Sequence, residues 1–156
     1  MNTIYTISLF LHSWNRWIIL VAGIIVITSA IHGLSRKKEY SQFQKRWSLI
    51  FLSSLHLQLL VGIVMYFFLS PITIQAMANF GAAMKDPVLR FWSVEHAFVN
   101  LIAIGLAQTG SIIVKRKANS NAKHKLTLIW SGIALLLILA MIPLGLMGVE
   151  RPWFRF

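Results

Sequence analysis

The sequence predicts an all-α membrane protein, a single up-down-up-down bundle of four transmembrane helices that spans residues 1–156. The first observation is composition, because 57% of the residues are hydrophobic and only 12% are charged, unlike a soluble domain. The second is that the apolar residues fall into four stretches of about 20 residues or more, the length that crosses a bilayer. The third is that short basic segments separate these stretches, as they do in the loops of membrane proteins.

The first apolar stretch runs from Leu9 to Leu34. It is too long for a signal peptide and lacks a small-residue cleavage site, so it is interpreted as a true span. The other three stretches run from Trp47 to Leu69, from Phe91 to Val114 and from Leu126 to Met147. Within the longest connection, Ser70 to Arg90, the segment IQAMANFGAAM predicts a short helix at the membrane interface.

The distribution of lysine and arginine predicts the orientation of the spans. Ten of the 15 lie in the first and third loops, namely Arg36, Lys37, Lys38, Lys45, Arg46, Lys115, Arg116, Lys117, Lys123 and Lys125. The other five are Arg16, Lys85, Arg90, Arg151 and Arg155. The positive-inside rule therefore predicts that the first and third loops face the cytoplasm and that both termini lie on the opposite side of the membrane.

The net charge of +11 raises the question of a nucleic-acid partner. The basic residues form short blocks between apolar runs, which is typical of membrane flanks, so we expect the lipid bilayer and no nucleic acid. The chain has no cysteine, which excludes disulfides, thiolate metal sites and a cysteine nucleophile. No Gly-rich phosphate loop, GxSxG elbow or carboxylate pair is found either.

Ionisable side chains inside the spans are the functional candidates, because a charge in a bilayer costs several kcal/mol unless it is paired or faces a cavity. They are His12, Arg16, His56, Glu95 and His96. With a rise of about 1.5 Å per residue, His12 and His96 lie at similar heights in the outer half, whereas His56 lies near the midplane. His32 and His124 are expected at the headgroup level, where an imidazole needs no functional explanation.

Two histidines at one height on facing helices can bind a flat ligand between them. Haem b is the first candidate, because imidazole is a common axial ligand and helix bundles often hold cofactors in their cores. His12 and His96 are thus the predicted iron ligands. Arg16 and Arg90 are candidates for hydrogen bonds to the haem propionates, although anchoring to lipid phosphate is an equally ordinary role for them.

Two further features leave alternatives open. Glu95 points about 100° away from its neighbour His96 on the helix. We therefore expect Glu95 to bind a histidine or an arginine of another span, and Arg16 is one such candidate. The small residues that follow His96 at helical spacing, Ala103, Ala107 and Gly110, either leave room for a cofactor or let a neighbouring helix approach closely. A zinc, copper or non-haem iron site is disfavoured, because His56 lies about 13 Å from His96 in height.

Four sequence motifs cover nearly the whole chain. They are LHSWNRW (Leu11–Trp17), SLHLQLLVGIVMYF (Ser54–Phe67), GAAMKDPVLRFWSVEH (Gly81–His96) and KHKLTLIWSGIALLLILAMIP (Lys123–Pro143). Together they resemble a family of small four-span bacterial membrane proteins, described as cytochrome b-like and common in the Bacteroidetes. The resemblance implies a bacterial cytoplasmic (inner) membrane, and with the predicted orientation both termini are expected in the periplasm.

The resemblance implies haem and assigns functional histidines at positions 12, 56, 96 and 124. It therefore makes His56 a cofactor-binding candidate, either as an alternative axial ligand or as a ligand of a second cofactor with His124 or His32. The family pattern has a proline after the glutamate–histidine pair, whereas this chain has Ala97. The resemblance implies no particular reaction.

The preferred interpretation is a membrane-embedded electron carrier with bis-histidine haem b in the periplasmic half of the bundle. Its expected partner is a quinone or a respiratory membrane protein, and the sequence leaves the oligomeric state open. The alternative is a cofactor-free accessory or scaffold subunit whose histidines form interhelical hydrogen bonds. A small proton-coupled transporter that uses Glu95 and His56 is disfavoured, because the spans have no breaks at mid-membrane.

Overall fold

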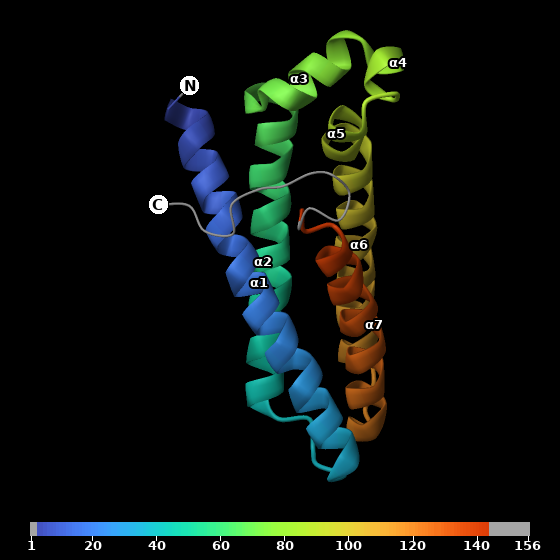
Figure 1. Ribbon diagram of the computed structural model, residues 1–156. Coiled ribbons are helices and arrows are strands. Elements are labelled where there is room, and N and C mark those ends of the chain that lie inside the picture. Colours follow the sequence, from blue (N-terminus) through green and yellow to red (C-terminus); the bar gives the residue numbers. More distant parts are fainter. Residues whose placement is uncertain (1–2, 144–156) are drawn as a thin grey trace.

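The computed structural model describes residues 3–143 as four helical rods connected by short loops (Figure 1). The first rod is α1 (Thr3–Ser35), and the second is α2 (Gln42–Val64) with a π-helical turn, η1 (Met65–Leu69). The third contains α5 (Pro87–Arg90), a second π-helical turn η2 (Phe91–Glu95) and α6 (His96–Lys115), and the fourth is α7 (Ser120–Ala140). Each rod is long and apolar enough to cross a membrane, which confirms the predicted all-α fold class.

All four rods begin earlier than the apolar stretches predict, and in the second and fourth rods polar side chains cap the first turns. Before α2, the Ser41 hydroxyl accepts from the Gln44 amide, and the Gln44 side chain accepts from the Ser41 amide, which forms a capping box. Before α7, the Asn119 side chain accepts from the amides of Asn121 and Ala122. The predicted end of the fourth span at Met147 lies outside the described residues.

The connection between the second and third rods is helical, as predicted, but it contains a break. α3 (Pro71–Ala78) begins with proline at its first position after the cap residue Ser70. The backbone leaves the helical region at Asn79, and α4 (Phe80–Ala83) follows. Figure 1 shows these short helices crossing the end of the bundle that is opposite the two basic loops.

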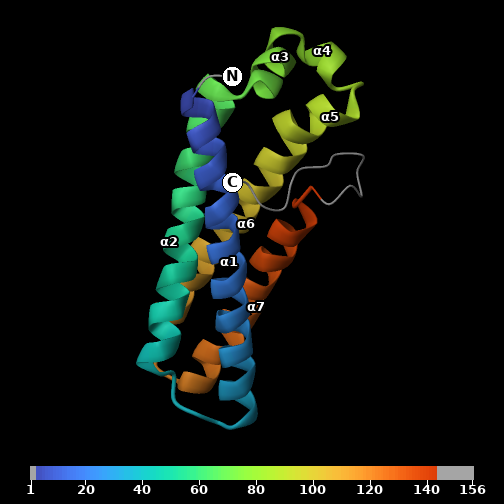
Figure 2. The same ribbon diagram turned by 60° about the vertical axis from the view of Figure 1, so that its left-hand side comes forward.

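The four rods are arranged so that α1 and α6 lie on a diagonal. α1 packs against α2 and α7, and α6 packs against α7 and α2. Figure 2 shows that the α1–α2 pair and the α6–α7 pair diverge toward the end where α3 crosses. This diagonal is the arrangement in which side chains of the first and third spans face each other through the bundle axis.

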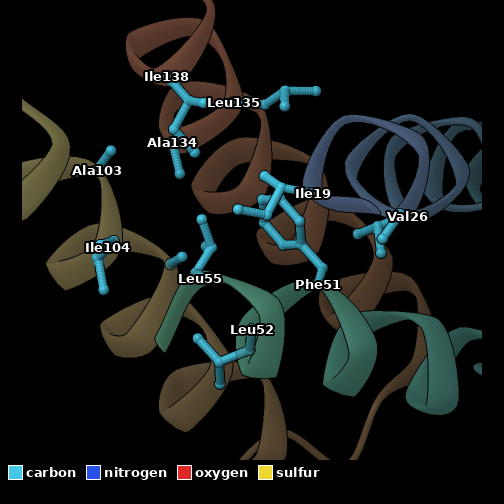
Figure 3. Close-up of a cluster of buried hydrophobic side chains, with 12 residues drawn as sticks. Ile19, Val26, Phe51, Leu52, Leu55, Ala103, Ile104, Ala134, Leu135 and Ile138 are labelled. Carbon is cyan, nitrogen blue, oxygen red and sulfur yellow. The ribbon is translucent and has the colours of Figure 1, made fainter. Parts of the chain in front are cut away.

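A hydrophobic core fills the middle of the bundle (Figure 3). It consists of Ile19, Ala22, Val26, Phe51, Leu52, Leu55, Ala103, Ile104, Ala107, Ala134, Leu135 and Ile138. Gly110 lies so close to Trp130 of α7 that even an added Cβ atom would collide with that side chain. The small residues of α6 therefore serve close packing against α7, one of the two alternatives that the sequence left open.

A polar network closes the bundle at the end with the basic loops. His124 lies near the start of α7, close to the basic loops as expected, but its side chain is fully buried. Its Nδ1 accepts from the Gln44 side-chain amide over 3.0 Å, and its Nε2 donates to the carbonyl of Lys38 over 3.0 Å. Gly33 packs directly against the ring and leaves no room for a Cβ atom. Because both ring nitrogens are satisfied, His124 has a structural role that joins α1, α2 and α7.

Candidate functional site

The structure brings His12 and His96 together. Their ring centres lie 6.3 Å apart, and the ring planes are inclined by 51°. His12 comes from α1 and His96 from the first residue of α6, so the two imidazoles meet across the diagonal of the bundle. No other two of the predicted functional histidines form a ring contact in the described part of the chain.

The hydrogen bonds of His96 determine its tautomer. Its Nδ1 lies 3.1 Å from the main-chain carbonyl oxygen of Met141 at the end of α7. A carbonyl oxygen only accepts, so Nδ1 carries the proton and Nε2 keeps its lone pair. Asn100 donates to the main-chain oxygen of His96 over 2.7 Å, and the Trp92 ring packs 5.1 Å from the imidazole. The imidazole is thus held in place with a free electron pair, as metal-binding histidines are.

His12 differs, because its ring is incompletely satisfied. Its Nδ1 is buried and has no hydrogen-bond partner, and it is the one such side-chain atom among residues 3–143. A buried polar atom without a partner costs about 1–3 kcal/mol. On the α2 side Gly62 lies beside the ring, where an added Cβ would make ordinary van der Waals contact at 3.7 Å from His12 Cε1. The ring therefore borders the cavity, and the protein supplies no hydrogen-bond partner for its Nδ1.

Both rings line a cavity of about 520 Å³ in the half of the bundle that α3 covers. Its walls come from α1, α2, η1, η2, α6 and the end of α7, and Ile72 and Thr73 of α3 contribute to its boundary. On α1 the wall extends from Tyr5 to Ile19, which corresponds to about 20 Å of helix. Most of the lining side chains are apolar, so the cavity suits a large, mainly hydrophobic ligand.

The cavity opens sideways between two rods. Ile63 and Phe67 of the second rod and Phe98 and Leu101 of α6 line the cavity and are also exposed. In a membrane these exposed apolar side chains contact acyl chains, so this opening faces lipid.

The two candidate arginines occupy different environments. Arg16 lines the cavity, and its guanidinium carbon lies 5.6 Å from the ring centre of Trp17. Arg90 is exposed and is not part of the lining; its Nε donates to Glu95 Oε1 over 2.7 Å. The partner of Glu95 is thus an arginine of its own rod, in place of the expected histidine or arginine of another span.

His56 is exposed on the outer face of α2 and does not line the cavity. Its neighbours Ser54 and Leu55 face the interior, and the helical turn of 100° per residue directs position 56 outward. The structure therefore does not bring His56 to the His12–His96 pair, nor to the buried His124. Within residues 3–143, no three His, Cys, Asp or Glu side chains converge where they could bind a metal ion.

Several polar residues of this region were not singled out from the sequence. Tyr66 of η1 donates from its hydroxyl to the carbonyl of Ser93 in η2 over 2.6 Å, which ties the two π-helical turns together beside the cavity. π-Helical turns inside α-helical rods often occur at functional sites. Asn15 and Gln58 form a second link, between α1 and α2. The signal that could have identified all four is the presence of hydrogen-bonding side chains inside apolar stretches.

Comparisons with known proteins add no identification. No protein-family model matches the chain, and neither the curated proteins nor the solved structures contain a match. The resemblance to cytochrome b-like proteins therefore remains a prediction.

Proposed function

We propose that this chain is a membrane-embedded b-type haem protein that carries electrons, with His12 and His96 as the two axial iron ligands. The single observation that carries the proposal is the meeting of these two imidazoles in an apolar cavity. The proposal includes a bacterial inner-membrane location, which the excess of basic residues in the first and third loops supports. In that orientation the haem occupies the periplasmic half.

The spacing of the two rings suits one metal ion between them. Two imidazoles on opposite sides of a metal, each with a metal–nitrogen bond of about 2.0 Å, have ring centres about 6 Å apart. The observed separation is 6.3 Å. The described residues provide no third His, Cys, Asp or Glu side chain that could bind a metal ion together with this pair. A macrocycle that itself supplies four nitrogen ligands therefore fits the pair better than a bare metal ion does.

The hydrogen bonding of the rings also suits axial ligation. His96 presents an Nε2 lone pair, because the Met141 carbonyl accepts the proton at Nδ1. The buried, unpartnered nitrogen of His12 indicates that its ring lacks an interaction partner, which a bound cofactor can provide directly or through its own polar groups. A cofactor-free scaffold would leave this atom unsatisfied and the cavity without a purpose.

The rest of the cavity fits the remaining parts of a haem. Its apolar walls match the macrocycle, and among residues 3–143 Arg16 is the cation of the lining that can donate to a propionate. Bound haem would supply one-electron chemistry at its iron. If both imidazoles bound the iron, no position would be left for a substrate, so a carrier is a better assignment than a catalyst. The partner that fits a lipid-facing opening is a quinone or another membrane protein.

The visible absorption spectrum of protein purified from haem-replete cells tests the proposal. We expect a Soret band that shifts on reduction with dithionite, together with sharp α and β bands and iron in the metal analysis. His12→Ala and His96→Ala should each abolish this spectrum. A colourless wild-type preparation, or one that contains only another metal, would contradict the proposal and favour the cofactor-free scaffold.

A further inference from the structure

Two amide side chains connect α1 and α2 directly beside the histidine pair. Asn15 of α1 is buried, and its side-chain nitrogen donates to Gln58 Oε1 of α2 over 2.8 Å. The same nitrogen donates to the main-chain oxygen of Ser54 over 2.8 Å. Together these contacts form a polar bridge between two helices whose sequences are otherwise mostly apolar.

The bridge ends on the residue that carries one of the two imidazoles. Gln58 uses its amide nitrogen to donate to the main-chain oxygen of His12 over 2.9 Å. Gln58 also lines the cavity, so it lies between the polar bridge and the ligand space. One side chain thus contacts Asn15 and the His12 backbone at the same time, and both contacts are with α1.

From these contacts we infer that Gln58 is a positioning residue for His12, an inference that rests on the proposed haem site. A hydrogen bond to a main-chain carbonyl restrains the height and rotation of a helix, and therefore the direction of its Cα–Cβ bonds. The bridge to Asn15 holds the Gln58 amide in the orientation in which its nitrogen faces His12. The result is that the His12 ring is kept at the height of His96.

The two ligands are therefore supported in different ways. The His96 ring is held by its own hydrogen bond to Met141, whereas the His12 ring has no hydrogen bond at its buried Nδ1. The position of His12 consequently depends on its backbone, which is the group that Gln58 contacts. Loss of the Gln58 amide should release His12 from the iron before it affects His96.

Binding of carbon monoxide to the reduced haem measures this release. Iron with two imidazoles excludes carbon monoxide, and iron that has lost His12 binds it, which shifts the Soret band. Because the His12 imidazole is still present in Gln58→Leu and only its backbone restraint is lost, we expect this variant to keep its haem, unlike His12→Ala, and to bind carbon monoxide at least about tenfold more readily than the wild type. Gln108→Leu is the matched control, because Gln108 lies in a span, is absent from the cavity lining and has no hydrogen bond to the pair.

Different outcomes separate the two proposals. If the wild type contains haem but Gln58→Leu binds carbon monoxide no better than Gln108→Leu does, the positioning role alone is overturned. A wild type without haem overturns the haem site, and the positioning role with it. Should Gln58→Leu fail to fold, the Asn15→Leu/Gln58→Leu double variant decides, because removal of both partners leaves no unpaired amide. Carbon monoxide binding by the double variant supports the role, and a closed haem refutes it.

Discussion

The imidazole rings of His12 and His96 meet across the bundle diagonal at a centre-to-centre distance of 6.3 Å. One residue lies near the start of the first rod and the other follows a π-helical turn in the third. This relationship depends on the divergence of the two helix pairs, which opens the cavity around the rings. The relationship leads to predictions about the ligands, the arginines, the opposite end of the bundle and the topology.

The first prediction concerns the identity of the ligands. In His12→Gly and His96→Gly the haem content should fall by at least about tenfold, because each variant lacks one axial bond. Free imidazole added to the medium should restore the spectrum, since it can occupy the space of the deleted ring. His56→Gly is the control and should keep its haem, because His56 is exposed on the outer face of α2. Equal loss in all three variants would show that the effect is not specific to ligation.

The second prediction distinguishes the two arginines. Arg16→Gln should weaken haem binding by about 1.5–3 kcal/mol, the usual contribution of a hydrogen bond to a charged group. Arg90→Gln should leave haem binding unchanged, because Arg90 is exposed, pairs with Glu95 and is not part of the lining. Titration of the apoprotein with haem measures both affinities. Stronger weakening in Arg90→Gln than in Arg16→Gln would reverse our assignment of the propionate partner.

The third prediction concerns helix packing at the end with the basic loops. Gly33→Ala should destabilise the protein by about 1–3 kcal/mol, because the new methyl group collides with the buried His124 ring. Gly105→Ala is matched, since Gly105 is also helical but has open space around it, and it should stabilise by up to about 1 kcal/mol. Thermal unfolding in detergent measures both effects. Equal effects of the two substitutions would show that Gly33 is not under steric constraint.

The fourth prediction concerns the His124 network. His124→Ala should cost about 2–5 kcal/mol, because it leaves a cavity and removes the partners of Gln44 and of the Lys38 carbonyl. His32→Ala should change stability by less than about 0.5 kcal/mol, since His32 is exposed. Because the network lies at the opposite end from the cavity, haem content should stay constant once both variants are folded. Loss of haem from folded His124→Ala protein would reveal a second role for that residue.

The fifth prediction concerns topology. The chain has no cysteine, so single cysteines can be introduced without background. In cells, Asp86→Cys should react with a membrane-impermeant maleimide, whereas Lys37→Cys and Lys117→Cys should react only after the membrane is permeabilised. The excess of basic residues in the first and third loops is the physical reason for this orientation. The opposite labelling pattern would place the histidine pair in the cytoplasmic half.

Much of the fold follows from the sequence because the bilayer restricts the available structures. An apolar stretch of sufficient length must form a helix to satisfy its backbone, which determines four rods and their alternating directions. The polar caps Ser41 and Asn119 were not used in the prediction, and for this reason the observed second and fourth helices begin earlier than expected.

The candidate site was only partly predictable. Heights along a helix follow from the constant rise per residue, so the similar depth of His12 and His96 could be inferred. Which side of a helix faces the bundle core is harder to predict when the helix is apolar on all sides, because lipid-facing and core-facing positions hold similar residues. Height alone separates His56 from the cavity pair, but hydropathy does not predict that His56 is exposed, or that His124 is buried while His32 is exposed.

The sequence by itself determined that this chain forms four membrane-crossing helices, with basic loops at one end and ionisable groups at certain depths. Only the tertiary structure decided which of those groups meet. It placed α1 and α6 on the diagonal, paired Arg90 with Glu95, buried His124 and linked Gln58 to the His12 backbone. The physical reason is that hydropathy and helical rise act along one chain segment, whereas contacts between rods depend on the rotation of each helix about its own axis.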